Sequence, residues 1–128
     1  MLPVRAEALK GHLDGLLLSV LESGPRHGYA VIEALRAGSG GVFDLPTGTV
    51  YPALHRLERA GLVEGSWLEG SGRRRRSYRL TAAGRRSLGE QRTTWREFSA
   101  AVSALLGGGS DRSPGGDLNG DAAWPARA

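Results

Sequence analysis

The sequence predicts a mainly α-helical protein that carries one small β-hairpin. Apolar residues recur at helical spacing in four segments, and glycines and prolines separate these segments from one another. Near the middle of the chain, two short runs flank a glycine-rich turn, as the strands of a hairpin do. A chain of 128 residues is long enough for one domain with a modest core.

A first helix is expected to begin at about Arg5 or Leu9 and to end near Ser23. Proline has no amide hydrogen to continue the helical ladder, so Gly24 and Pro25 stop this helix. Its apolar residues share one stripe: Leu9, Leu13, Leu16, Leu17, Val20 and Leu21.

A second helix is expected from Gly28 to just before Gly38. Its buried side is formed by Val31, Ile32 and Leu35. The small residues 38–41 then form a loop, and residues 42–45 are either a short strand or an extended lead-in to the next helix.

A third helix is expected to open at Pro46 and Thr47 and to end before Gly61. The hydroxyl of Thr47 or of Thr49 is placed to cap its first turn. Gly61 suits the position after the helix, where a positive φ is needed. The apolar stripe of this helix contains Val50, Leu54 and Leu57.

A hairpin follows, with a strand over residues 62–68, a turn over 69–72 and a returning strand that ends at residues 77–80. The returning strand begins with four consecutive arginines, Arg73 to Arg76.

The last predicted helix begins after Thr81, its expected N-cap, and reaches about Leu106. Gly84 stands where a capping box would place Glu, so this cap is only half made. The helix carries a short heptad pattern of Leu88, Trp95 and Val102 with Gln91, Phe98 and Leu105. Residues 107–128 are too poor in apolar side chains to fold, and we expect a disordered tail in which Trp124 is an isolated aromatic residue.

The charge of the chain indicates a polyanionic partner or a solvated basic surface. The net charge is +4 and the pI is about 10.3, and sixteen of the seventeen basic residues are arginine. Arginine favours bidentate contacts with phosphate and guanine, although a codon bias would also explain its abundance. The chain has no apolar segment long enough to span a membrane and no secretory leader, so we expect a soluble cytoplasmic protein.

The third helix and the hairpin together have the outline of a winged helix on DNA. The exposed side of this helix would read base edges in a major groove, and the arginines would contact an adjacent phosphate backbone. Structural alternatives remain open: Tyr51 and Pro52 can pack at the helix start, Arg56 can pair with Glu33 or Glu58, and the arginines can be a solvated run. The candidate DNA-binding residues are Tyr29, Thr47, Gly48, Thr49, Tyr51, Pro52, His55, Arg56, Arg73, Arg74, Arg75 and Arg76.

A homodimer is expected because the last helix carries an apolar stripe with little chain left to cover it. Trp95 is open to two interpretations: it stacks on a flat ligand at the dimer centre, or it fills the dimer core together with Phe98. The candidate interface or effector-pocket residues are Leu9, Leu13, Leu17, Leu88, Trp95, Phe98, Val102 and Leu105.

An enzyme is not expected, and no cofactor is implied. His12, His27 and His55 lie on separate predicted elements, and no nucleophile–base spacing or phosphate-binding glycine motif is present. The sequence contains no cysteine, which excludes disulfides and thiolate metal sites. An alternative to DNA binding is a winged helix that serves as a protein-interaction module.

These motifs resemble the PadR family of bacterial transcriptional regulators over roughly residues 8–106. The resemblance is carried by Leu9, Gly11, Leu16 to Leu18, Leu21, His27 to Tyr29, Gly48 to Leu54, Arg56 to Glu58, Gly61, Leu62, Trp67, Tyr78, Leu80, Thr81, Gly84 and Trp95.

The resemblance implies a winged helix-turn-helix DNA-binding domain over residues 1–80 and a dimerisation helix over residues 81–106. It also implies repression of nearby genes from a pseudo-palindromic operator on double-stranded DNA, and a response to small aromatic or drug-like molecules. The single long C-terminal helix is similar to that of the shorter subfamily. The four-arginine hairpin is more basic than the family pattern requires, which indicates stronger non-specific affinity for DNA.

Overall fold

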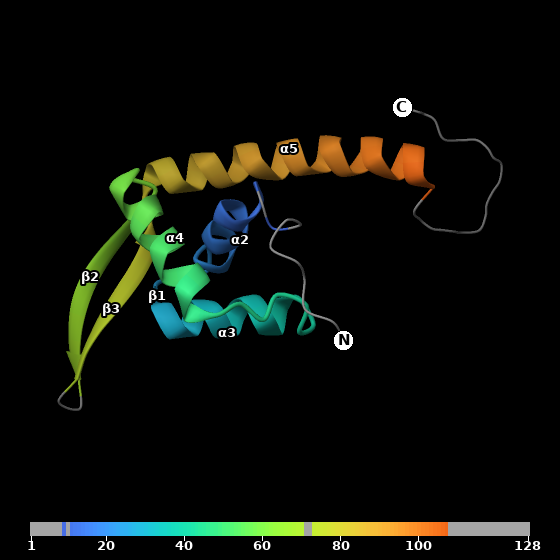
Figure 1. Cartoon of the computed structure of the whole chain (residues 1–128). Helices are drawn as coiled ribbons and strands as arrows, with labels where there is room; N and C mark the ends of the chain where they lie inside the picture. The colour runs from blue at the N-terminus through green and yellow to red at the C-terminus, as the bar shows by residue number, and fades with distance from the viewer. Residues whose placement is uncertain (1–8, 10, 71–72, 108–128) are drawn as a thin grey trace. The chain divides into compact units, whose positions relative to one another are not determined.

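The computed structural model describes residues 9, 11–70 and 73–107, which form four helices and three strands (Figure 1). Arg5, residues 71–72 of the predicted turn, and the predicted tail from residue 108 with Trp124 lie outside the described residues. In chain order the elements are α2 (Leu13–Val20), β1 (Arg26–His27), α3 (Gly28–Gly38), α4 (Thr47–Arg59), β2 (Val63–Gly70), β3 (Arg73–Leu80) and α5 (Ala82–Leu106).

The chain divides into two compact units, and the division falls inside α5. The first unit ends at Gln91 and the second begins at Arg92. The first unit therefore contains α2, α3, α4, the three strands and the beginning of α5.

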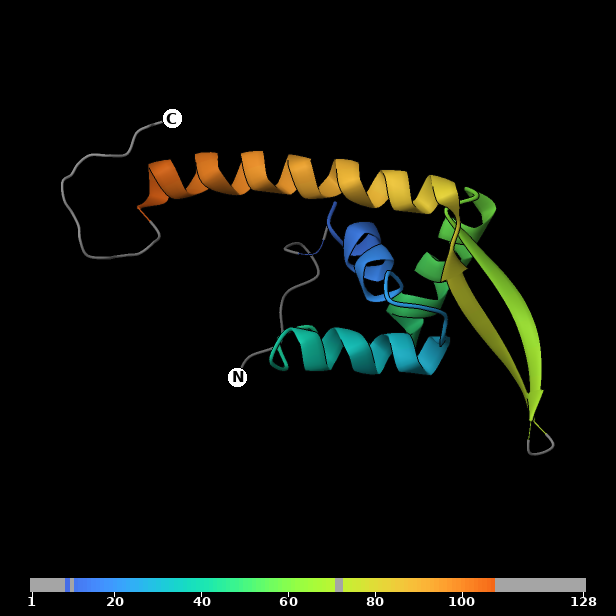
Figure 2. The ribbon, with the colours of Figure 1, turned by 180° about the vertical axis from the view of Figure 1, so that it is seen from behind.

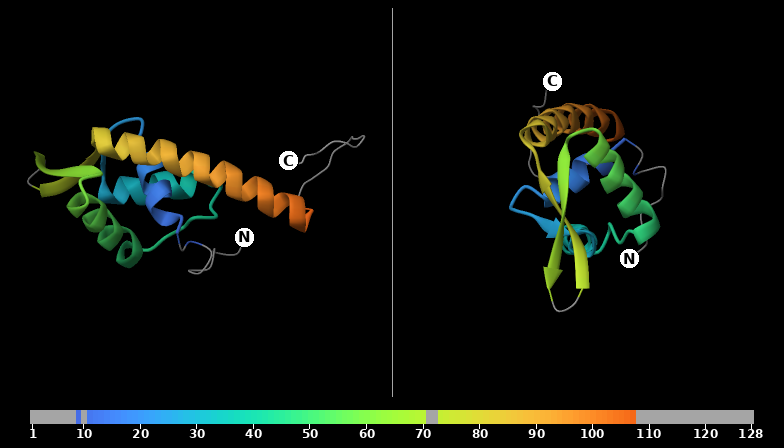
Figure 3. Two further views of the ribbon diagram at one scale, coloured as in Figure 1. Left: turned by 90° about the horizontal axis from the view of Figure 1, so that it is seen from above. Right: turned by 90° about the vertical axis from the view of Figure 1, so that its left-hand side faces the viewer.

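The three strands form one antiparallel sheet in the order β1-β3-β2. The register of β2 with β3 runs from Val63 opposite Leu80 to Gly70 opposite Arg73, and the distal end of this hairpin extends beyond α3 and α4 (Figures 2 and 3). β1 was not predicted, because two residues are too few to show a strand pattern in a sequence. Its pairing of Arg26 with Tyr78 depends on a contact across the fold.

The core of the first unit lies where α4 packs against α2, α3 and β2. The predicted buried residues of α3 and α4 are confirmed, and burial of each large apolar side chain contributes about 1.5–3 kcal/mol. The largest fully buried side chains are Tyr78, Leu17, Leu18, Leu21, Leu54, Leu57, Val31, Val50 and Val63.

Two helix starts differ from the predictions. Leu9 is helical as predicted, but the helix is interrupted and α2 begins only at Leu13, since Gly11 has a φ of 83°, which an α-helix does not allow. The N-cap of α4 is Pro46, and no side chain caps this helix, so the predicted capping by Thr47 or Thr49 is wrong. Residues 42–45 are the extended lead-in and not a strand.

Gly61 ends α4 as predicted. Its φ is 78°, and its amide donates to the carbonyl of Glu58 at 3.0 Å. The amide of Leu62 donates to the carbonyl of Leu57, also at 3.0 Å. These two bonds satisfy the last carbonyls of the helix in a Schellman motif and direct the chain into β2.

The first turn of α5 is joined tightly to the end of α4. The hydroxyl of Thr81 donates to the carbonyl of Gly61 at 2.7 Å and accepts from the amide of Gly84 at 3.0 Å, which confirms Thr81 as the N-cap. A Cβ on Gly84 would lie 2.0 Å from the carbonyl oxygen of Leu62. Gly84 is therefore required by close packing, which explains why the capping glutamate is missing.

We predict that Gly84→Ala lowers the free energy of unfolding by about 1–3 kcal/mol, because backbone must move to admit the methyl group. Gly89→Ala is the matched control, since a Cβ there would meet no atom within 4 Å. This control should be neutral or stabilising by up to about 1 kcal/mol, the usual gain from alanine in a helix. Urea unfolding followed by circular dichroism measures both variants, and equal stability of the two would contradict the prediction.

Candidate nucleic-acid interface

The start of α4 presents backbone amides and small side chains to solvent. Thr47 and Gly48 are exposed and Thr49 is half-buried. The first amides of a helix have no acceptor within the helix, and its positive dipole end attracts anions. Pro52 is also exposed and cannot donate to the carbonyl of Gly48, four residues earlier. A phosphate oxygen can therefore approach this surface closely.

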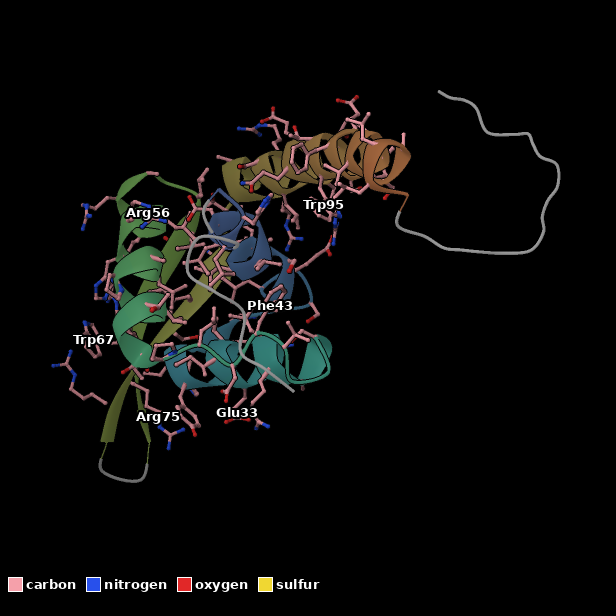
Figure 4. The ribbon with its side chains drawn as sticks, turned by 45° about the vertical axis from the view of Figure 1, so that its right-hand side comes forward. Glu33, Phe43, Arg56, Trp67, Arg75 and Trp95 are labelled. Atoms are coloured by element: carbon pink, nitrogen blue, oxygen red, sulfur yellow. The ribbon has the colours of Figure 1, made fainter. Side chains whose placement is uncertain are left out.

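Two further predicted contacts, His55 and Arg56, are exposed on α4. Arg56, labelled on α4 in Figure 4, forms an ion pair with Asp14 of α2, and not with Glu33 or Glu58, the partners expected from the sequence. An exposed ion pair of this kind is worth about 0–1 kcal/mol. The guanidinium of Arg56 is thus held in place by a partner that a phosphate can displace.

Tyr51 connects α4 to α3 through a very close contact. A Cβ built on Gly28 would lie 2.2 Å from the nearest carbon of the Tyr51 ring. Only glycine at the start of α3 leaves room for this ring. Tyr51 is half-buried, so it has a structural role as well as a surface that remains available.

An open hollow lies along α3 and is also lined by β1, by Tyr51 of α4 and by the first half of β3. Its lining includes two tyrosines and four arginines from β1, α3, α4 and β3: Arg26, Tyr29, Tyr51, Arg74, Arg75 and Arg76. Glu33 also lines the hollow, on the same side of the molecule as Arg75, and its carboxylate is paired with Arg36 (Figure 4). Tyrosine hydroxyls and guanidinium groups are donors that suit a phosphate backbone.

The four consecutive arginines at the start of β3 do not share one environment. Residues opposite each other in an antiparallel pair lie on the same face, so Arg76 shares a face with Trp67, and Arg75 shares the other face with Leu68. Arg76 forms an ion pair with Glu58, while Arg74 and Arg75 are exposed. Arg73 lies at the distal end of the strand, opposite Gly70.

Tyr78 shows how the arginine run meets the core. Burial raises the pKa of the Tyr78 phenol above its ordinary value, and the positive charge of Arg76 acts in the opposite direction. The phenol therefore remains neutral at physiological pH. Tyr78 is a core residue, and the cationic surface begins with its neighbours toward the distal end of the hairpin.

The predicted interface residues fall into two groups. Leu9, Leu17 and Leu88 are buried in the core of the single chain, and Leu13 is half-buried. The second group is mostly exposed in the second unit: Trp95, Phe98, Val102 (half-buried) and Leu105.

Sequence reasoning missed three contributions to this region. Arg26 lines the hollow and donates through Nε to the carbonyl of Val20 at 2.6 Å, which satisfies the end of α2. His27 and Glu33 also line the hollow. His27 belongs to the motif with Gly28 and Tyr29, but the sequence does not show that strand pairing and helix packing bring these three residues to the arginines.

Comparison with known proteins identifies the family. Residues 17–90 match the sequence pattern of the Transcriptional regulator PadR-like family. The chain is 40% identical over 91 residues to Transcriptional regulator Rv3488 of Mycobacterium tuberculosis, a match that covers 71% of this chain and 69% of that protein.

Solved structures agree with this result. A PadR family transcriptional regulator from Eggerthella lenta is 34% identical, with a TM-score of 0.70 over 80% of this chain and 88% of that chain. A PadR-like transcriptional regulator from Bacillus cereus is 30% identical, with a TM-score of 0.69 over 81% of this chain and all (100%) of that chain. The chain therefore belongs to the PadR-like family of transcriptional regulators, which confirms the predicted family and winged-helix fold. These proteins are regulators and not enzymes.

The described residues contain neither a candidate metal site nor a candidate membrane-spanning helix. No group of three or more His, Cys, Asp or Glu side chains is placed to hold a metal ion in that part of the chain. Across the same ranges, no helix is long and apolar enough to cross a membrane.

We predict that Gly28→Ala displaces the Tyr51 ring and lowers the free energy of unfolding by about 1–3 kcal/mol. The same substitution should cost much less in a Tyr51→Ala background, because the ring that the methyl group would meet is gone. Gly38→Ala, at the other end of α3, is the control, since no atom lies within 4 Å of its added Cβ. Urea unfolding of the four members of the cycle measures the coupling, and additive effects would contradict the predicted contact.

Proposed function

We propose that this protein is a sequence-specific DNA-binding transcriptional regulator that acts as a homodimer and represses genes near its operator. The observation that carries the proposal is the hollow, where Tyr29, Tyr51 and the arginines of β3 meet beside the exposed start of α4. A DNA partner also implies that the protein acts in the cytoplasm.

The elements have complementary tasks in this proposal. α4 is the recognition helix: its apolar side is buried, and Thr47, Tyr51 and His55 face base edges in a major groove. The β2–β3 hairpin is the wing, whose arginines contact the neighbouring phosphate backbone. Tyr29, at the start of α3, contributes a phosphate contact from the third side of the hollow.

Two copies of the chain would place two recognition helices in successive major grooves. Dimeric helix-turn-helix proteins bind half-sites about 34–36 Å apart, or one helical turn of DNA. The operator is then a pseudo-palindrome, because the two-fold symmetry of the protein is matched by the symmetry of its site.

We predict that Arg75→Ala weakens binding to all DNA sequences and reduces the slope of log K against log salt by about one. Arg86→Ala, at an exposed arginine on α5 that does not line the hollow, is the control with the same change in charge. Fluorescence anisotropy with the DNA upstream of the gene, and with scrambled DNA, measures both variants across a salt series. His55→Ala should instead change the preference between the two DNAs with little effect on the salt slope.

The same titration separates DNA binding from the alternative function. Tight, salt-dependent binding of the unmodified protein that exceeds binding to scrambled DNA supports a specific regulator. Equal binding to both DNAs would show a non-specific clamp. No binding at low salt would overturn the proposal and favour a winged helix that binds another protein.

We also propose that residues 81–106 form the dimerisation helix and residues 1–80 the DNA-binding domain. The support is an apolar stripe at heptad spacing on the part of α5 that lies in the second unit. Trp95 and Phe98 contact each other at a ring-centroid distance of 6.2 Å, and Leu105 is 88% exposed. A second copy of α5 offers the same stripe and would cover it by two-fold symmetry.

The family resemblance adds a small aromatic effector as a second role for Trp95. A ligand stack and a dimer contact would use the same indole ring, and Phe98 already packs beside it at a tilt of 41°. We therefore propose the dimer contact as the main role of Trp95, with an effector site as a role that shares the same surface.

We predict that Phe98→Glu converts the dimer to a monomer at micromolar concentration, because the carboxylate would be buried without a partner at the helix interface. Ala100→Glu is the control: it adds the same charge to the same helix, but helical spacing places it on the opposite side from the stripe. Sedimentation velocity measures the mass of each variant. A monomeric unmodified protein, or two variants with the same mass, would contradict this assignment.

A further inference from the structure

We infer that Trp67 is a positioning residue that holds Arg74 and Arg76 in one ordered stack on the wing, anchored to α4 through Glu58. We call this set of four side chains the arginine stack. The inference rests on the proposed DNA-binding function and specifies how the wing prepares its cations for the phosphate backbone.

The indole ring of Trp67 is in contact with two guanidinium groups. The Cζ atom of Arg74 lies 4.5 Å from the ring centroid, and the Cζ atom of Arg76 lies 5.2 Å from it. Both distances are within the range of a cation–π interaction. The strand register explains the geometry, because Trp67 is directly opposite Arg76 and diagonal to Arg74 on the same face.

Arg76 connects this stack to the recognition helix. Its guanidinium forms an ion pair with Glu58 on the last turn of α4, and the side chains of the two residues are only 27% and 28% exposed. A Cβ on Gly65 would lie 2.8 Å from Nε of Arg76, so Arg76 lies across the space that this glycine leaves. Arg76 is thus held by Trp67, Glu58 and Gly65 together, and it serves as a support for the wing.

The position of Trp67 favours this role over a place in the core. It is 54% exposed, on the distal half of a hairpin whose buried residues, Val63, Tyr78 and Leu80, lie near the base. The neighbouring Leu68 is also exposed, at 49%, but it belongs to the other face with Arg75. The two neighbours therefore differ mainly in which arginines share their face of the hairpin, Arg74 and Arg76 for Trp67 and Arg75 for Leu68.

Ordering an arginine before it binds has a direct consequence for affinity. A long side chain loses rotamer freedom when it contacts a phosphate, which opposes binding. A guanidinium already stacked on an indole ring has lost part of that freedom in the free protein. Arg74 is exposed and stacked, so its contact with phosphate benefits most from this prior ordering. Arg75 lies on the other face and is independent of Trp67.

The first experiment tests the stack in the free protein. NMR of arginine-labelled protein should show upfield ring-current shifts for side-chain signals of Arg74 and Arg76 but not of Arg75. Trp67→Leu should abolish these shifts, Trp67→Phe should keep part of them, and Leu68→Ala should leave them unchanged. Absence of the shifts in the unmodified protein would overturn the inference without any reference to DNA.

The second experiment tests the consequence for DNA. Trp67→Leu should weaken binding in the anisotropy assay about two- to fivefold, the range for an exposed cation–π contact. Trp67→Phe should recover most of this loss, and Leu68→Ala should have no effect. The loss caused by Trp67→Leu should shrink in an Arg74→Ala background, because Trp67 then has less to position.

The outcomes separate this inference from the proposed function. If Trp67→Leu weakens binding equally in both backgrounds, Trp67 contacts DNA itself or stabilises the hairpin generally, and the positioning role is wrong. If Trp67→Leu abolishes the shifts but leaves affinity unchanged, the stack exists without a role in binding, which also overturns the inference. If the shifts are present but the unmodified protein binds no DNA, the proposed function fails while the stack itself is confirmed.

Discussion

The packing of the Tyr51 ring on Gly28 is the contact on which the candidate interface depends. It fixes the start of α4 against the start of α3, and α3 follows directly after β1. Because β1 pairs with β3, the start of α3 is also linked to the strand that carries the wing arginines. A methyl group on Gly28 would displace the Tyr51 ring, which lines the hollow. The two most distinctive motifs of the sequence, around Gly28 and around Tyr51, are thus the two halves of one contact.

The cations that this packing brings together differ in their ion pairs and in their exposure to solvent. Arg76 is partly withdrawn from solvent and paired with Glu58, while Arg56 is paired with Asp14 at an exposed site. The exposed pair is weak and can be replaced by phosphate, but the less exposed pair is screened less by water and persists. The surface therefore has cations that support the wing and cations that remain available to a ligand. The net charge of the chain cannot distinguish these roles.

α5 belongs to both units, and its two ends differ in how much of their surface is covered. At its start, Gly84 lies against the backbone at Leu62, and Thr81 binds the end of α4, so this turn is held by close contacts. Beyond Gln91, the helix belongs to the second unit, and its apolar stripe is largely exposed. This contrast is consistent with one helix that is fixed to a DNA-binding domain at one end and available to a second copy at the other.

The sequence by itself determined the helices, the hairpin and the buried sides of α3 and α4, because apolar periodicity and glycine or proline stops are local signals. It also predicted the roles of Gly61 and Thr81, which depend on local backbone geometry. Only the tertiary structure showed the third strand, the partner of Arg56 and the close packing that requires glycine at position 84. Each of these depends on residues that are distant in the chain. The tertiary structure also placed Leu17 and Leu88 in the core, since an apolar stripe in a sequence does not show which part of the fold covers it. It likewise showed which residues share each face of the hairpin with the arginines.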